Sequence, residues 1–206
     1  MARIDDYINA RKIAVDSLLK DNFNDLISRS GFEKYDDKTF RFSFLDRVYK
    51  VGFPGFEFKD EAQENKEIPL QEQVLILHYM MAENVLDASS SGNLISYREI
   101  PGASFYYSAF LKRAVDPLKK AFGNNIPGFI KSAQKINGVD IKYGDAGFEF
   151  QVFPKVTIQL ILWEGDDEFP PEANILFGET IQDRLSPEDV AWLAGMLVYR
   201  LMALSR

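Results

Sequence analysis

Two stretches of the chain alternate apolar and polar residues with a period of two. Every second residue of 40–44 is a phenylalanine, and every second residue of 156–162 is Val, Ile or Leu. Because successive side chains of a β-strand point to opposite faces, this spacing predicts strands with one buried face. Short turns at 46–47 and 154–155 join each stretch to a second apolar run, so we expect antiparallel hairpins.

Longer stretches have the spacing of helices. Apolar residues recur at helix-like intervals over 4–27, which predicts one helix or two helices with a break at Asp21-Asn22. Residues 70–88 are apolar nearly all round, which is typical of a central helix. Ser186-Pro187 followed by two acids predicts the start of a C-terminal helix, and Asp116-Pro117 predicts another start in the same way. The fold class is therefore α+β, with mainly antiparallel β-hairpins or a meander packed against a central apolar helix and flanking helices.

We expect one domain over residues 1–206, because neither half would close a sheet comfortably with its own helices. The alternative is a division into 1–88 and 94–206 at the loop that precedes residue 94. In the one-domain arrangement, aromatic and aliphatic side chains of both strand regions form one core against the 70–88 helix. These side chains are Phe40, Phe42, Phe44, Phe148, Phe150, Leu160 and Leu162.

The charge balance argues against a nucleic-acid partner. The chain has 31 Asp and Glu against 24 Lys and Arg, a net charge of -7, whereas a polyanion requires a basic surface. No apolar run approaches the roughly 20 residues that span a membrane, and the first residues lack the apolar stretch of a secretion signal. The chain has no cysteine, which excludes disulfides and thiolate-ligated sites. We expect a cytoplasmic protein that binds neither nucleic acid nor membrane.

An acidic segment follows the second alternating stretch. No Lys or Arg occurs between Lys155 and Arg184, whereas seven Asp and Glu do, and these seven match the net charge of -7. Carboxylates suit Ca²⁺ or Mg²⁺, so Asp166, Asp167 and Glu168 are candidate metal ligands. Their spacing is not that of the EF-hand loop. The alternatives are a solvated turn and a surface for a ligand or a partner.

A second candidate site lies between residues 98 and 107. Arg98 and Glu99 precede a Pro-Gly turn, and Tyr106 and Tyr107 begin the next predicted helix. An arginine fork beside phenol groups can bind a carboxylate or another anion. The alternative is a structural ion pair of Arg98 with Glu99 or Glu172.

Trp163 is expected to join the two candidate sites. Trp163 ends the strand at 156–163, and its indole is expected on the face of the strand opposite the buried one. The indole would be exposed to solvent there unless another segment packs over it. We expect Trp163 to converge with Arg98 and Glu172 around one concave patch. His78, the only histidine, is either a hydrogen-bonded core residue or a catalytic base. No catalytic residue is assigned, and the ligand-binding candidates are Arg98, Glu99, Tyr106, Tyr107, Trp163, Glu164, Glu172 and Asn174.

Three segments resemble a known bacterial family, domain-of-unknown-function family 3786. They are LILHY at 75–79, ISYREIPG at 95–102, followed by Tyr107 and Ala109-Phe110, and WEGD through FPPEAN at 163–174. The resemblance covers roughly residues 69–201. It implies a protein that is frequent in anaerobes and is sometimes joined to an iron–sulfur cluster-binding domain. Because this chain has no cysteine, any cluster would come from a protein partner.

These observations leave three classes of function open, and the third of them is a purely structural interaction module. The first is a ligand- or partner-binding accessory protein in anaerobic cofactor or iron–sulfur-linked metabolism, a role that rests on the resemblance. The second is an enzyme with an acidic and Arg–Tyr pocket that uses Glu164 or Glu172 as acid/base and Arg98 to anchor the substrate. The residues imply no particular cofactor, and a small-molecule ligand fits either of the first two classes.

Overall fold

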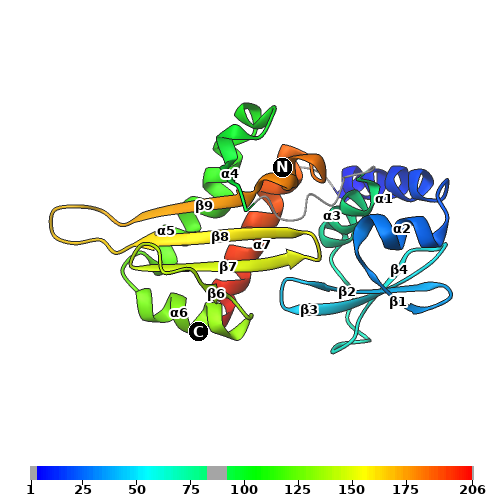
Figure 1. Cartoon of the computed structure of the whole chain (residues 1–206), viewed down its shortest axis with the longest axis horizontal. Coiled ribbons are helices and arrows are strands. Elements are labelled where there is room, and N and C mark those ends of the chain that lie inside the picture. The colour runs from blue at the N-terminus through cyan, green and yellow to red at the C-terminus, as the bar shows by residue number, and fades with distance from the viewer. Residues whose placement is uncertain (1–3, 83–91, 206) are drawn as a thin grey trace. The chain divides into compact units, whose positions relative to one another are not determined.

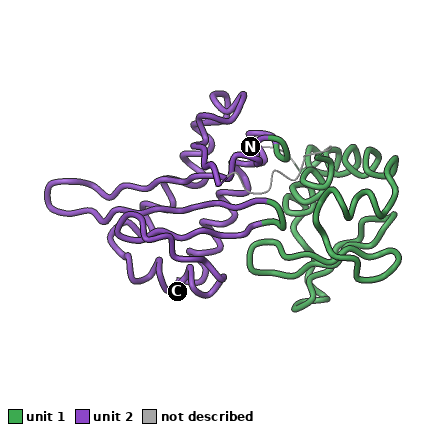
Figure 2. The backbone as a smooth tube through the Cα atoms, viewed as in Figure 1, with its two compact units in different colours: residues 1–88, 153–155, 183–185 green, residues 89–152, 156–182, 186–206 purple. Residues whose placement is uncertain are grey.

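The computed structural model describes residues 4–82 and 92–205, which form two compact units. Unit 1 contains the described residues up to 82, together with Phe153–Lys155 and Asp183–Leu185, and unit 2 contains the rest (Figure 2). Each unit has its own antiparallel sheet with helices (Figure 1). The α+β class is therefore confirmed.

Unit 1 is a four-stranded meander with three helices. The strands lie in the order β1-β2-β3-β4. The helix expected over 4–27 is interrupted at Asn22, whose side chain accepts a hydrogen bond from the backbone N–H of Asp25 and begins a second helix. The elements are α1 (Ile4–Leu18), α2 (Phe23–Ser30), β1 (Glu33–Asp36), β2 (Thr39–Phe44), β3 (Arg47–Gly52), β4 (Glu57–Asp60) and α3 (Leu70–Met81).

Aromatic rings fill the interior of unit 1. The three phenylalanines of β2 are all buried, as the alternation predicted. Phe42 stacks on Phe32 with the ring centroids 3.7 Å apart. Tyr79 of α3 stacks on Phe153 at 4.2 Å with the rings 3° from parallel, and Phe44 contacts Phe153 at 4.8 Å. Phe153, from the turn of a later hairpin, is therefore part of this core.

The carbonyl end of α2 binds the two segments that come from later in the sequence. Lys155 Nζ donates to the Ser28 carbonyl at 3.2 Å, and Arg184 Nη1 donates to the Arg29 carbonyl at 3.4 Å. The Tyr79 hydroxyl donates to the next carbonyl, Ser30, at 2.6 Å. The last carbonyls of a helix lack helical partners and carry partial negative charge, so cationic donors stabilise them.

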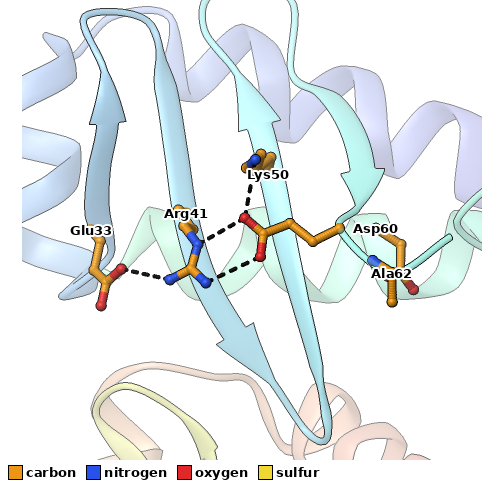
Figure 3. Close-up of polar contacts among 6 residues, drawn as sticks. Glu33, Arg41, Lys50, Asp60 and Ala62 are labelled. Carbon is orange, nitrogen blue, oxygen red and sulfur yellow. Dashed lines mark hydrogen bonds and ion pairs between the residues drawn. The ribbon is translucent and has the colours of Figure 1, made fainter. Parts of the chain in front are cut away.

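A network of ion pairs lies on one face of the unit 1 sheet (Figure 3). Arg41 of β2 donates to Glu61 through Nε at 2.9 Å and to Glu33 of β1 through Nη1 at 2.9 Å. Lys50 of β3 lies 3.1 Å from Glu61. Hydrogen bonds from Arg41 and then Lys50 lower the pKa of Glu61 to about 2.

Glu61→Gln should therefore destabilise the protein at neutral pH and lose that effect in acid. The folded-state pKa of Glu61 lies below its ordinary value of 4.5, so its contribution is present above pH 4.5 and disappears as the pH falls towards about 2. Urea unfolding of both proteins across this range measures the difference. A difference that persists unchanged at about pH 2 would contradict the assignment.

Unit 2 is a five-stranded antiparallel sheet in the order β5-β9-β8-β7-β6. Aromatic rings from its helices pack on one face of this sheet. The ring centroids of Phe129 and Phe148 are 5.5 Å apart, and those of Phe110 and Phe177 are 6.1 Å apart. Its strands are β5 (Leu94–Ser96), β6 (Val139–Asp140), β7 (Ala146–Phe153), β8 (Val156–Trp163) and β9 (Glu172–Gly178). Its helices are α4 (Tyr107–Phe110), α5 (Asp116–Phe122), α6 (Ile126–Lys135) and α7 (Pro187–Leu204), with 3₁₀ turns η1 (Tyr97–Glu99), η2 (Ala103–Phe105) and η4 (Glu179–Asp183).

The element α5 begins at Asp116, with Pro117 in its first turn as expected, but Asp116 does not cap a separate helix. The backbone stays helical from α4 through the π-helical segment η3 (Leu111–Val115) into α5, and the Asp116 N–H donates to Leu111 five residues earlier. Pro117 lacks the N–H that would reach the carbonyl of Arg113, and the wider π turn accommodates this loss. A Cβ on Gly195 of α7 would lie 3.1 Å from that carbonyl, so α7 passes close to the π segment.

Two further expectations need correction. The central helix ends at Met81, and the residues from 83 to 88 that were assigned to it lie outside the described part of the chain. The rings expected in one core divide between the units: those of β2 lie in unit 1, whereas Phe148 and Phe150 lie in unit 2. Whether residues 1–206 unfold as one domain stays a prediction.

In the ranges 4–82 and 92–205, no helix has the length and apolar character to cross a membrane.

Candidate functional site

A short rigid segment of unit 2 presents the first group of predicted site residues. Arg98 and Glu99 lie in η1, and Tyr106 and Tyr107 lie at the start of α4. The Glu99 carboxylate accepts a hydrogen bond from the backbone N–H of Ser96 at 2.6 Å, which lowers the pKa of Glu99. Gly102 has φ +80°, a left-handed conformation that glycine adopts without strain. The segment is thus held by its own backbone contacts.

Arg98 is stacked on an aromatic ring. Its guanidinium carbon lies 4.2 Å from the centroid of the Tyr107 ring, a cation–π contact. Glu99 instead bonds the backbone of Ser96. Arg98 and Tyr107 therefore do lie together within this segment. Binding of an anion by this pair stays a prediction.

Several residues that the sequence did not single out support this stack. The Tyr97 ring is stacked on Phe110 at 4.2 Å, 3° from parallel, and its hydroxyl donates to the Pro187 carbonyl at 2.7 Å. Burial raises the pKa of Tyr97 to about 12. Arg113 of the π segment lies over the Trp192 ring at 4.5 Å. Pro117, four residues after Arg113, is the sequence signal that could have pointed to this distorted helix.

Phe105, at the end of η2, is the most exposed feature of the segment. It is 89% exposed, more than any other large apolar residue in the described chain. Figure 1 shows the region around the start of α4 projecting from the sheet of unit 2. We refer to Arg98, Phe105 and Tyr107 as the aromatic–arginine tip.

The acidic segment forms a braced turn between β8 and β9 (Figure 1). The Asp166 Oδ1 atom accepts from the backbone N–H groups of Glu168 and Phe169 at 2.8 and 2.7 Å. These bonds, the one from Phe169 first, lower the pKa of Asp166. The Gly165 N–H donates to the Gly123 carbonyl at 3.1 Å, which ties the turn to the end of α5. Throughout 4–82 and 92–205, no group of three or more His, Cys, Asp or Glu residues is placed to hold a metal ion.

Trp163 lies beside Glu172, one of the two residues expected near it, and also beside Tyr143. Its ring forms a T-shaped contact with the ring of Tyr143, with the ring centroids 6.1 Å apart and the ring planes at 80°. Glu172 is its cross-strand partner on β9, so these two predicted residues do lie together. Arg98 is stacked on Tyr107 instead. The structure thus brings the candidates together as two local groups.

The remaining candidates are placed as follows. Glu164, Glu172 and Asn174 are exposed, as are Asp167 and Glu168 on the acidic turn. The Glu164 backbone N–H donates to the Asp145 carboxylate at 2.7 Å. His78 is half-buried in α3 of unit 1, where its role stays open.

Comparison with known proteins gives one family. The family model described as Domain of unknown function (DUF3786) matches residues 22–200. No curated protein and no solved structure matches the chain. The match covers most of both units.

Proposed function

The chain belongs to the DUF3786 family, and we propose that it is an accessory protein that binds a protein partner through the aromatic–arginine tip. The observation that carries the proposal is the exposure of Phe105, which is 89% exposed on a projecting segment. A phenyl ring in that position gains the transfer free energy of an aromatic side chain when a partner covers it.

The composition of the tip supports the same conclusion. Aromatic residues and arginine are enriched at the centres of protein interfaces and among the residues that dominate binding energy. Arg98, already stacked on Tyr107, offers its guanidinium edge to a partner while its face is covered. The partner surface then has an apolar recess for Phe105 and a carboxylate for Arg98.

The rigidity of the segment lowers the cost of binding. The Ser96–Glu99 bond, the turn at Gly102 and the ring stack at Arg98 hold the tip in one conformation before a partner arrives. A surface that is already ordered loses less side-chain and backbone entropy on association.

The family resemblance directs the choice of partner. Relatives joined to an iron–sulfur cluster-binding domain would have the two modules in one chain, and this chain has no cysteine of its own. The first partner to test is therefore an iron–sulfur cluster-binding domain, with a role in anaerobic cofactor or iron–sulfur metabolism. For the enzymatic alternative, Glu164 and Glu172 are the proposed acid/base residues, and both are exposed.

Phe105→Ser should weaken binding of the iron–sulfur domain by about tenfold or more, because it removes a buried ring from the interface. Calorimetric titration of the full chain with the domain measures the dissociation constant. Phe169→Ser is the matched control, since Phe169 is also exposed, at 67%, but lies on the acidic turn. The control should bind as the unmodified chain does. Absence of binding, or an equal loss in both variants, would contradict the proposal.

A further inference from the structure

The loop between β6 and β7 is fixed across the end of β8. The Asp145 N–H donates to the Leu162 carbonyl at 2.9 Å, and the Asp145 carboxylate accepts from the Glu164 N–H at 2.7 Å. These two hydrogen bonds lie on either side of Trp163 in the sequence. Gly144 has φ +69°, and a Cβ there would lie 2.6 Å from the Leu162 carbonyl oxygen, so the close approach requires glycine. The loop is therefore held against β8 by its own contacts.

This attachment places an aromatic ring beside Trp163. The Tyr143 ring, which belongs to the loop, forms the T-shaped contact with the indole, and Tyr143 is 61% exposed. Glu172 is exposed on β9, directly opposite Trp163. Directly opposite residues of an antiparallel pair share one face of the sheet, with their Cβ atoms about 4.5–5.5 Å apart. We refer to Tyr143, Trp163 and Glu172 as the aromatic–carboxylate corner.

Within the described chain, no Lys or Arg lies over either ring of the corner. Other accessible rings do have such a partner. Lys50 Nζ lies 3.8 Å from the centroid of the Tyr35 ring, and the guanidinium carbon of Arg98 lies 4.2 Å from that of Tyr107. Lys142 immediately precedes the tyrosine of the corner, but its ammonium group is paired with a carboxylate of β6 at 2.9 Å. The rings of the corner therefore remain available to a cation from another molecule.

The local charge also favours a cation. No Lys or Arg occurs between Lys155 and Arg184, a range that includes all of β8 and β9, whereas seven Asp and Glu do. The face of an aromatic ring attracts a cation through its quadrupole, and Glu172 adds a full negative charge on the same face of the sheet as Trp163. The excess of carboxylates around both strands attracts cations over a longer distance.

The exposure of the corner favours a side chain of a larger partner over a free small cation. A cation–π contact at an exposed site is weak by itself, and an exposed carboxylate adds little more. A chain segment supplies further contacts around the same point, which a small ion lacks. A lysine or arginine side chain also has the matching form, since its methylene stem packs on a ring while its charged group reaches a carboxylate.

We propose that the aromatic–carboxylate corner binds a lysine or arginine side chain from a basic segment of a protein partner. The attachment of the loop reduces the entropy that is lost on binding, because the Tyr143 ring is already positioned. The aromatic–arginine tip requires the opposite charge from its partner, a carboxylate for Arg98. The corner is therefore a second surface of unit 2, and its role does not depend on that of the tip.

The fluorescence of Trp163 reports binding at the corner. The chain has two tryptophans, so Trp192→Phe leaves Trp163 as the only one, and the unmodified chain checks that this substitution leaves binding intact. Each protein is titrated with a synthetic peptide of alternating glycine and lysine, and with its arginine, glutamine and glutamate counterparts, at constant ionic strength. We expect a saturable change in emission with the lysine or the arginine peptide and none with the other two. If neither basic peptide gives a saturable change, or if the glutamine peptide gives the same change, the proposal is wrong.

Two substitutions in the corner, made in the Trp192→Phe chain, separate the contributions of its groups. Glu172→Gln should weaken binding of the basic peptide about threefold, the size expected for an exposed ion pair. Tyr143→Leu should weaken it by about the same factor, because leucine keeps the apolar bulk but has no π face. Glu168→Gln is the matched control, since it removes the same charge from the exposed acidic turn, and it should change the affinity much less.

The same variants can overturn the proposal. If Glu168→Gln weakened binding as much as Glu172→Gln, the peptide would be attracted to the acidic segment as a whole and not bound at the corner. If Tyr143→Leu bound the basic peptide as tightly as the parent chain, the aromatic contact would have no part in binding.

Discussion

Phe153→Ala should lower the free energy of unfolding by about 3–5 kcal/mol, the usual range for removal of a buried phenylalanine. Phe153 is 1% exposed and packs between two rings. Its ring centroid lies 4.2 Å from that of Tyr79 and 4.8 Å from that of Phe44. Alanine would leave a cavity between two rings that belong to a helix and a strand of unit 1. Urea unfolding followed by circular dichroism measures the change.

The matched control for this substitution is Phe169→Ala. Phe169 is 67% exposed on the acidic turn, so its removal should change stability by no more than about 0.5 kcal/mol. A loss below about 1 kcal/mol for Phe153→Ala would mean that the hairpin turn is not part of the unit 1 core.

Phe150 lies in unit 2, and Phe150→Ala should lower the free energy of unfolding by about 3 kcal/mol or more. The residue is 3% exposed, and a Cβ on Gly138 would lie 2.7 Å from its ring, so the chain after α6 passes directly over it. The surrounding backbone has little freedom to close the cavity that alanine would leave. A loss below about 1 kcal/mol in the same urea assay would place the ring outside the core.

The two substitutions together address the domain organisation. Phe153 and Phe150 lie three positions apart on one strand but belong to different units. If residues 1–206 unfold as one domain, both variants shift the same single transition. If the two units unfold separately, each variant shifts a different transition.

Local patterns allowed much of the fold to be predicted. The alternation over 40–44 identified β2 and its buried face, and the Ser186 cap identified the start of α7, where Ser186 Oγ accepts from the Asp189 N–H. These features depend on residues close in sequence. Phe153 could not be assigned to unit 1 in this way, because alternation gives the face of a strand and not the element that covers it. The π segment at 111–115 was missed since Pro117 was taken as a helix start.

The candidate site shows the same division between local and distant contacts. Arg98 and Tyr107 were grouped because they are close in sequence, and they do stack. Trp163 was expected beside Arg98, yet its T-shaped ring contact is with Tyr143, which lies in the loop between β6 and β7. The course of such a loop leaves no periodic signal in the sequence. The prominence of Phe105 was also not predicted, since exposure depends on how η1 and η2 fold back before α4.

Hydrogen exchange of the full chain, with and without an iron–sulfur cluster-binding domain, tests the central claim that the aromatic–arginine tip is the docking surface. The account predicts slower exchange at the backbone amides of residues 97–107 when the domain is present. It also predicts unchanged exchange at the acidic turn, residues 164–171. The account would be contradicted if exchange slowed at residues 164–171 but stayed unchanged at residues 97–107. It would also be contradicted if exchange changed at neither segment.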